Sequence, residues 1–250
     1  MISIKSSSDL ERMRRAGIIN AGALEAAKRA VHPGMSTKEL DRVIHSFITS
    51  HGGKPSFLGY NGFPGSSCIS LNDTVIHGIP SADLKIREGD IVSVDVGTYL
   101  DGFHADSATT FPVGEISGEA KRLLDSTSES LMLAIGMAAP GVRLGDISHA
   151  IQEYNESRGF GVVREYVGHG VGRNLHEEPE VPNFGKPGHG LRLMPGMTIA
   201  IEPMITGGGF AVRQLGDGWT VKTRDGSLAA HFEHTIAITK DGSVILTRPE

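Results

Sequence analysis

The chain has 250 residues and a formal net charge of −5 at pH 7, and its Lys and Arg residues never run longer than a pair. This balance excludes the basic face of a nucleic-acid-binding protein, and the single cysteine, Cys68, excludes an intramolecular disulfide and a cysteine-based zinc site. No 18-residue apolar run and no signal-peptide start occur, so we expect a cytoplasmic protein with no membrane span and no nucleic-acid partner.

Two helices are predicted near the start of the chain. Residues 9–30 carry apolar side chains at helical spacing, and the pattern ends at a Pro-Gly turn. Ser36 and Glu39 form a capping-box motif, in which each side chain bonds to the backbone of the other at the first turn of a helix. That second helix is expected to stop at the glycine pair 52–53, before a loop rich in Gly, Pro and Ser.

A β-hairpin that carries two acidic residues follows. Strands are predicted over residues 91–97 and 103–111, and the Asp-Gly pair at 101–102 is a strong signal for a two-residue turn. That turn puts Asp95 and Asp106 on one face as diagonal neighbours, about 7–8 Å apart at most between Cα atoms. A cation between two converging carboxylates removes their repulsion. A solvent-facing surface is the alternative, but the small and apolar residues around the acids favour a metal-binding cavity.

The second half of the chain repeats this order of elements. Helical patterns cover residues 119–138 and 144–159, and a strand is predicted over 197–203. Chance recurrence of Pro-Gly turns is one explanation, but the matching helix–helix–strand order favours a degenerate duplication. One shift of 107 residues relates three pairs of positions: Pro33-Gly34 and Pro140-Gly141, Gly89 and Gly196, Asp95 and Glu202.

The repeat predicts how the domain is organised. We expect one catalytic domain, residues 1–250, with pseudo-symmetric halves at about 9–111 and 117–247. The two halves would pack about a pseudo-two-fold axis, with Asp95 facing Glu202 across it.

Two histidines and two further acids lie in the second half. His169 and His176 are flanked by glycines, which leave room for a ligand around an imidazole, although a lone histidine is more often structural. Glu202 and Glu233 each stand in an otherwise apolar strand pattern, where a strand-end charge that reaches solvent is the alternative. Glu177, by contrast, is expected to be a solvated loop acid.

These side chains together predict a dinuclear metal site. Oxygen-rich ligands with one imidazole suit Mn, Fe, Co or Zn, and four carboxylates carry the charge of two divalent ions rather than one. Paired ions polarise a carbonyl group and lower the pKa of water, which is hydrolase chemistry. No GxSxG elbow and no P-loop motif competes with this interpretation. The candidate ligands are Asp95, Asp106, His169, Glu202 and Glu233.

At these residues the sequence resembles the methionine aminopeptidases, in particular their short bacterial type I form. The segments that carry the resemblance are GYNGFPGSSCISLNDTVIHGIP, GDIVSVDVGTYLDGFHADSATTF, EYVGHGVGRNLHEEP, PGMTIAIEPM and DGWTVKTRDGSLAAHFEHT. The ligand order Asp, Asp, His, Glu, Glu with gaps of 11, 63, 33 and 31 residues is similar to the family's pattern. The resemblance implies the pita-bread fold, an α/β (α+β) architecture of two helix–helix–sheet halves around a mainly antiparallel sheet.

The resemblance also implies a role for each ligand. Asp95 would chelate one metal ion, Asp106 and Glu233 would bridge two ions, and His169 and Glu202 would complete the second ion's ligands. Glu202 would in addition act as the proton shuttle of the reaction.

Further residues are implied to contact the substrate. His176 would bond to the scissile peptide and stabilise the tetrahedral intermediate, and His77 would contact the substrate amide. Phe57 stands where many relatives have a small Cys, and Leu175 where many have an aromatic residue, so the pocket width can differ from theirs. The methionine pocket is implied to draw on Phe57, Tyr60, Phe63, Cys68, Leu175 and Trp219.

The implied activity is removal of the N-terminal methionine from peptides and nascent proteins whose second residue is small. The resemblance implies a monomer with two divalent ions (Mn, Co, Fe or Zn) and a transient contact with the ribosome. Two alternatives remain. A proline aminopeptidase of the same fold carries a large extra N-terminal domain, whereas the first helix here is expected from residue 9. A non-catalytic relative would have lost metal ligands, whereas all five are present.

Overall fold

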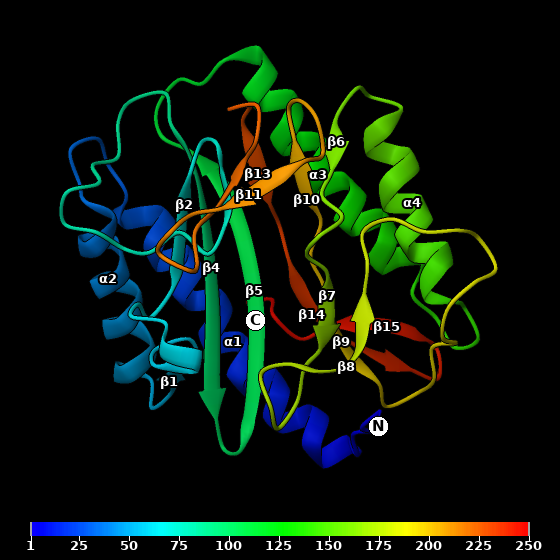
Figure 1. The fold of residues 1–250 in the computed structure, drawn as a ribbon. Helices are drawn as coiled ribbons and strands as arrows, with labels where there is room; N and C mark the ends of the chain where they lie inside the picture. The colour runs from blue at the N-terminus through cyan, green and yellow to red at the C-terminus, as the bar shows by residue number, and fades with distance from the viewer. Residues whose placement is uncertain (1, 250) are drawn as a thin grey trace.

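The computed structural model describes residues 2–249, and the α-helices of this part of the chain lie in two pairs (Figure 1). All four predicted helices are present, with ends within a few residues of those expected. None of the helices in residues 2–249 is long and apolar enough to cross a membrane. Their bounds are α1 Ser7–Ala30, α2 Thr37–Ser50, α3 Gly118–Met137 and α4 Leu144–Glu156.

Side-chain caps determine where the helices begin. At α2 the predicted capping box is confirmed, because Ser36 Oγ accepts from the Glu39 backbone N–H at 3.2 Å and the Glu39 carboxylate accepts from the Ser36 N–H at 2.7 Å. A second capping box, between Ser6 and Asp9, starts α1 at Ser7. That helix therefore begins two residues earlier than the apolar stripe alone predicted.

The strands pair antiparallel throughout the described residues and form four small sheets. One sheet contains β1, β2, β4 and β5, and another has the order β15-β14-β9-β7-β8; two three-stranded sheets complete the fold. The strands are β1 Lys54–Pro55, β2 Cys68–Leu71, β3 Thr74–Ile76, β4 Ile91–Leu100, β5 Phe103–Pro112, β6 Gly161–Val162, β7 Gly168–Gly170, β8 Glu177–Val181, β9 Thr198–Ile201, β10 Met204–Thr206, β11 Val212–Gln214, β12 Val221–Thr223, β13 Ala229–His231, β14 His234–Thr239 and β15 Gly242–Ile245.

The acidic hairpin has the predicted register. Leu100 pairs with Phe103 across the two-residue turn, and Asp95 pairs with Ala108. Asp106 lies opposite Gly97, so the two aspartates are diagonal neighbours on one face. The strands are longer than predicted, because the ladder continues on both sides of the acids.

Each helix pair covers its own set of strands. The apolar faces of α1 and α2 pack on β2, β4 and β5, and those of α3 and α4 pack mainly on β9, β10 and β14 (Figure 1). A smaller core joins the two sets, since Met13 of α1 and Phe103 of β5 pack with Ala200 of β9 and Ala237 of β14. Strand ends from both sets therefore meet in the middle of the molecule, which agrees with the pita-bread fold class.

The strand predicted over 197–203 is interrupted, which corrects the sequence-based expectation for Glu202. Strand β9 ends at Ile201 and pairs with β7 and β14, whereas β10 begins at Met204 and pairs with β6 and β13. Pro203 has no N–H to continue a ladder, so the chain leaves one sheet and enters another at this point. Glu202 thus lies at a break, whereas Asp95 lies inside a continuous strand.

Glu233 lies at a second break of the same kind. Strand β13 ends at His231 and β14 begins at His234, so Glu233 also occupies a gap between two strands rather than the interior of one. Both glutamates lie where the chain passes from one sheet to another. The backbone at each of them is therefore not part of a regular strand.

Candidate active site

A cavity of about 400 Å³ opens where the two sets of strands meet. Every side chain predicted above as a metal ligand, catalytic group or pocket residue lines it, from Phe57 in the first half to Glu233 in the second. The structure therefore brings the whole predicted set into one volume. The roles assigned to the individual residues remain predictions.

Pairing between strands explains why the acids converge. Because His234 pairs with Ile201, the residues just beyond the ladder, Glu202 and Glu233, come together at the end of the β9–β14 pair. The Glu233 N–H donates to the Ala108 carbonyl at 2.9 Å, which ties this end to the acidic hairpin.

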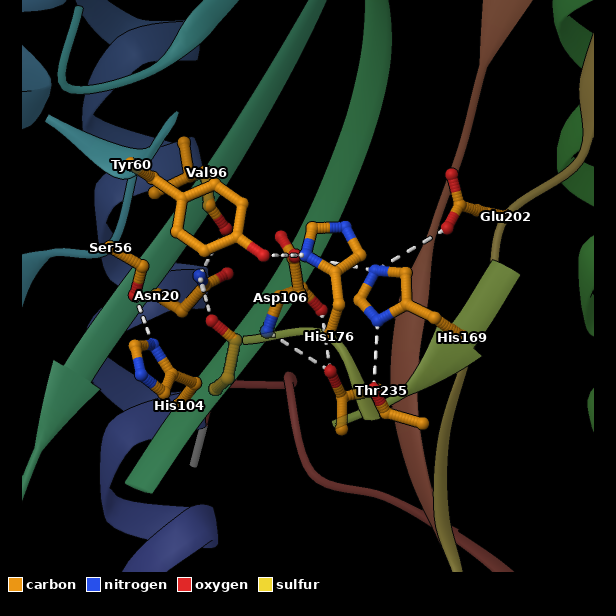
Figure 2. A network of polar contacts seen from close by, with 12 residues as sticks. Asn20, Ser56, Tyr60, Val96, His104, Asp106, His169, His176, Glu202 and Thr235 are labelled. Carbon is orange, nitrogen blue, oxygen red and sulfur yellow. Dashed lines mark hydrogen bonds and ion pairs between the residues drawn. The ribbon is translucent and has the colours of Figure 1, made fainter. Parts of the chain in front are cut away.

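A second link between the sheets holds Asp106. Its backbone N–H donates to Thr235 Oγ1 at 3.0 Å, and the Thr235 hydroxyl donates to the Asp106 carbonyl at 2.7 Å (Figure 2). One threonine of β14 thus satisfies both backbone groups of the ligand residue on β5. The position of the Asp106 carboxylate relative to β14 is set by this pair of bonds.

The potential ligand atoms lie close enough to share a metal ion. Atoms of Asp106, His169 and Glu233 all lie within 4.8 Å of one another. His169 Nε2 is 3.8 Å from Asp106 Oδ2 and 3.6 Å from Glu202 Oε1, as Figure 2 shows for this cluster. Asp95 lies next to Asp106 in the same cavity.

The donor set fits divalent cations, and the strongest sign is a group of unsatisfied oxygens. Asp95 Oδ1, Asp106 Oδ1 and Glu233 Oε1 are buried with no hydrogen-bond partner among the described residues. Burial and the neighbouring carboxylates raise the pKa of Asp106 and of Glu233 well above the usual range, and burial raises the pKa of Glu202. Buried anions without partners are costly, and bound cations would compensate them.

His169 is prepared to act as a metal ligand. Its Nδ1–H donates to the Gly170 carbonyl at 2.8 Å, which leaves the Nε2 lone pair facing the carboxylates. Burial lowers the pKa of His169 to about 3, so the ring is neutral near pH 7. The residue lies in the short strand β7, between its two glycines.

His176 and His77 both line the cavity. The Tyr60 hydroxyl and His176 Nδ1 hydrogen-bond at 2.9 Å, and the His176 ring centroid is 4.0 Å from that of His169 (Figure 2). His77 has a positive φ of 58°, uncommon for a residue with a side chain, and its ring stands edge-on to Trp219. Burial lowers the pKa of His77 to about 4 and also lowers that of His176.

The predicted methionine pocket is an apolar cluster beside the acids. Phe57, Phe63, Cys68 and Leu175 are buried together, and Tyr60 and Trp219 pack against them. Gly97 makes room for this cluster, because a Cβ there would lie 2.6 Å from the Phe57 ring. The pocket therefore offers an apolar side chain a binding place next to the carboxylates.

Sequence reasoning missed some residues of the site. Tyr166 and Asn61 line the cavity, and His231 is buried with its Nε2 3.6 Å from Glu202 Oε2. His231 could have been found, because it stands two residues before Glu233, and residues i and i+2 of an extended chain share a face. Tyr166 lies in a loop and Asn61 in the three-residue 3-10 helix Tyr60–Gly62, and neither segment is long enough for a periodic pattern to indicate direction.

One expectation about a nearby acid was wrong. Glu177 is not a solvated loop acid, because its side chain is only 9% exposed and forms an ion pair with Lys5, whose side chain is 3% exposed. Its carboxylate also accepts from the Asn174 N–H at 3.2 Å. The N-terminal segment thus fastens the loop that carries Leu175 and His176, a contact that sequence spacing does not reveal.

Fold and site together define a metal-dependent hydrolase with an apolar pocket beside its metal ligands. The model of metallopeptidase family M24 matches residues 11–240. Methionine aminopeptidase 1 of Bacillus subtilis (strain 168) is 54% identical over 248 residues, which cover 99% of this chain and 100% of the relative. The methionine aminopeptidase of Escherichia coli K12 is 48% identical over 247 residues, which cover 98% of this chain and 94% of the relative. The chain therefore belongs to metallopeptidase family M24 and, within it, to the methionine aminopeptidases.

Solved structures agree with this assignment. The crystal structure of methionine aminopeptidase from Thermotoga maritima superposes with a TM-score of 0.98 at 48% identity and covers 99% of this chain and 100% of that one. Prolidase from Pyrococcus furiosus reaches a TM-score of 0.81 at 24% identity over 66% of its own length, which shows a shared fold alone. The predicted family and fold class are thus confirmed.

Proposed function

We propose that this chain hydrolyses the peptide bond after an N-terminal methionine, in peptides and nascent proteins whose second residue is small. One observation carries the proposal: a cluster of carboxylates and one imidazole opens directly into an apolar pocket. The pocket suits the methionine side chain, and the cluster suits the metal ions of a hydrolase.

Two divalent ions per chain would be held by five residues, and Mn, Co, Fe and Zn all suit these ligands. When bound, such ions polarise the scissile carbonyl and make water a better nucleophile near neutral pH. The five residues that would hold these ions are Asp95, Asp106, His169, Glu202 and Glu233. The unsatisfied buried oxygens of Asp95, Asp106 and Glu233 support this ligand set.

The chain's own groups would move protons and stabilise charge. Glu202, whose pKa burial raises, would accept a proton from the attacking water and deliver it to the leaving amine. His176 would donate from Nε2 to the scissile carbonyl oxygen as negative charge develops there, while its Nδ1 is held by Tyr60. His77, which also lines the cavity, would bond to the substrate amide.

The decisive assay compares two tripeptides. Protein stripped with a chelator and refilled with Mn or Co is expected to release methionine from Met-Ala-Ser and to leave Leu-Ala-Ser uncut. Ala-Pro-Ser serves as the control for the proline-specific activity of the fold's more distant members. Full activity after rigorous metal removal, confirmed by metal analysis of the same sample, would contradict the metal-dependent mechanism.

We also propose that residues 1–250 act as one catalytic domain made of two halves, at about 9–111 and 117–247. The cavity supports this organisation, because β4 and β5 supply two of the five ligands and later segments supply the other three. The proposal further places the chain in the cytoplasm as a monomer, in transient contact with the ribosome where nascent N-termini emerge. Sedimentation alone and with ribosomes tests the last two points.

A further inference from the structure

His231 is a buried histidine with an unsatisfied ring nitrogen. It ends strand β13, pairs with Met204 of β10 and is 2% exposed. Its backbone is satisfied, since the His231 N–H donates to Thr110 Oγ1 and its carbonyl accepts from the same hydroxyl. Its Nε2, however, has no hydrogen-bond partner among the described residues. A buried polar atom without a partner in a site of this kind calls for an explanation.

The unsatisfied nitrogen faces Glu202. His231 Nε2 lies 3.6 Å from Glu202 Oε2, while His169 Nε2 lies 3.6 Å from Glu202 Oε1 on the other side. The Glu202 carboxylate therefore sits between two imidazoles, one for each oxygen. Its backbone is also held, because Asn183 Nδ2 donates to the Glu202 carbonyl at 2.9 Å.

The two imidazoles differ in what holds their protons. The Nδ1–H of His169 is fixed by the Gly170 carbonyl, so its Nε2 has a free lone pair, as a metal ligand needs. No comparable acceptor bonds to His231 Nδ1 within residues 2–249, so nothing fixes that proton at Nδ1. His231 Nε2 does face an acceptor, Glu202 Oε2. A proton on Nε2 would let the imidazole donate to that carboxylate oxygen.

We propose that His231 is a positioning residue of the metal centre, whose Nε2–H donates to Glu202 Oε2 and keeps Oε1 turned toward His169. This inference deepens the proposed function and rests on Glu202 as a ligand and proton shuttle. An imidazole suits the task, because it offers an N–H without the permanent positive charge with which Lys or Arg would repel nearby cations. Hydrogen bonds of this kind orient a ligating carboxylate and raise metal affinity.

Nitrogen NMR tests the proton's place directly. Protein with ¹⁵N-labelled histidine is observed metal-free and loaded with Zn, and the His231 signals are assigned from a His231→Gln sample. We expect His231 Nε2 to carry a proton in the Zn-loaded protein, while the proton of His169 stays on Nδ1. An unprotonated His231 Nε2 in the Zn-loaded protein would overturn the proposal, because the residue would then be a ligand or a bystander.

Two variants test the function of the bond. His231→Gln keeps an N–H donor of similar reach, whereas His231→Leu removes it and keeps the site apolar. Titration of chelator-stripped protein with Mn, followed by calorimetry, is expected to show metal affinity tenfold to a hundredfold lower for His231→Leu and near wild type for His231→Gln. Wild-type affinity in the Leu variant, or equal losses in both variants, would refute the positioning role.

A matched control separates this role from general damage to the strand region. His234 is half-buried near the same strands, but its Nδ1 bonds to Thr247 Oγ1 at 2.9 Å and the residue does not line the cavity. His234→Gln should therefore leave Mn affinity unchanged. If His231→Leu fails to fold, the NMR result and the Gln variant still decide the question. Failure of the proposed function would appear separately, as wild-type protein that binds Mn but leaves Met-Ala-Ser uncut.

Discussion

The polar part of the cavity is made of buried carboxylates, and ionising each of them costs free energy in the metal-free fold. Asp106 and Glu233 are 3% and 2% exposed, and neither has a cationic Lys or Arg beside it in the described ion pairs. Burial is the first cause of their raised pKa values, and the neighbouring carboxylates are the second. Such an arrangement stabilises nothing by its own contacts. It agrees with the divalent-metal use of the metallopeptidase family to which the chain belongs.

His176 lies at the other side of the chemistry, where it would contact the substrate and not the metals. We expect His176→Ala to lower kcat for Met-Ala-Ser by about a hundredfold to a thousandfold, because one hydrogen-bond donor to the developing oxyanion is lost. Metal content should stay at the wild-type level, since the ring bonds to Tyr60. Steady-state kinetics and metal analysis of one sample check both points. Loss of metal in this variant would mean that its role is misassigned.

Contacts between distant segments hold the loop between β7 and β8 in place. The segment between β7 and β8 carries Leu175 and His176 and is fastened to the N-terminal segment by the Lys5–Glu177 ion pair. A more exposed pair, Arg173 with Asp9, joins the same two segments. The chain's first residues thus support the wall of a pocket that is built mostly by later ones.

Lys5→Met is expected to destabilise the protein by about 3–5 kcal/mol, because it leaves the Glu177 carboxylate buried without a counter-ion. Urea unfolding measures this loss, and kcat for Met-Ala-Ser should fall as well, since Glu177 directly follows His176. The double variant Lys5→Met/Glu177→Leu should recover most of the stability, because an apolar pair of similar volume replaces the ion pair. Equal losses in the single and double variants would contradict a coupled ion pair.

The start of α2 offers a second test at the level of secondary structure. Ser36→Ala removes the hydroxyl that accepts from the Glu39 N–H, and we expect a cost of about 1 kcal/mol in the free energy of unfolding. Thermal unfolding monitored by circular dichroism measures it. Activity on Met-Ala-Ser should not change, because neither residue lines the cavity. An activity loss larger than the stability loss would show a link that the structure lacks.

In the molecule as a whole, we expect metal binding and folding to be coupled through the acids at the junction of the two sets of strands. Burial raises the pKa of Asp95 to about 7 and that of Glu202 to about 8 in the metal-free fold. An acid whose pKa is higher in the folded than in the unfolded state binds its proton more tightly when folded. The stability that these acids contribute to the metal-free protein is therefore present at low pH and is lost as pH rises from about 4 to about 8.

This linkage predicts a pH-dependent response to metal. Saturating Mn should raise the melting temperature more at pH 8 than at pH 5, because the cations compensate carboxylates that are ionised only at the higher pH. Thermal melts of chelator-stripped protein with and without Mn, in a buffer of equal ionic strength, measure the difference. The same rise at both pH values would show that these acids do not couple metal binding to folding.

Helix caps and tight turns can be predicted from the sequence, because residues close together in the chain determine them. The Ser36 and Glu39 cap and the two-residue turn at 101–102 are short-range signals, and the turn by itself is enough to put Asp95 and Asp106 on one face. Helix ends differ by a few residues from the apolar pattern where a further cap acts, as at Ser6. The candidate ligands could be named as one group from their types and spacing, and the fold gathers them in one cavity.

Long-range packing decided the rest, because it depends on which strands meet. Glu202 lies at a break since Pro203 cannot continue the ladder and β10 joins a different sheet. Glu177 is buried because Lys5, far away in the sequence, lies against it. The spacing of His231 from Glu233 indicates a shared face, but its contact with Glu202 arises only where separate strands meet. The residue types and their local spacing therefore predict the kind of site and the turns of the chain. Only the packing of strands that are distant in the sequence brings the separate acids together in one cavity.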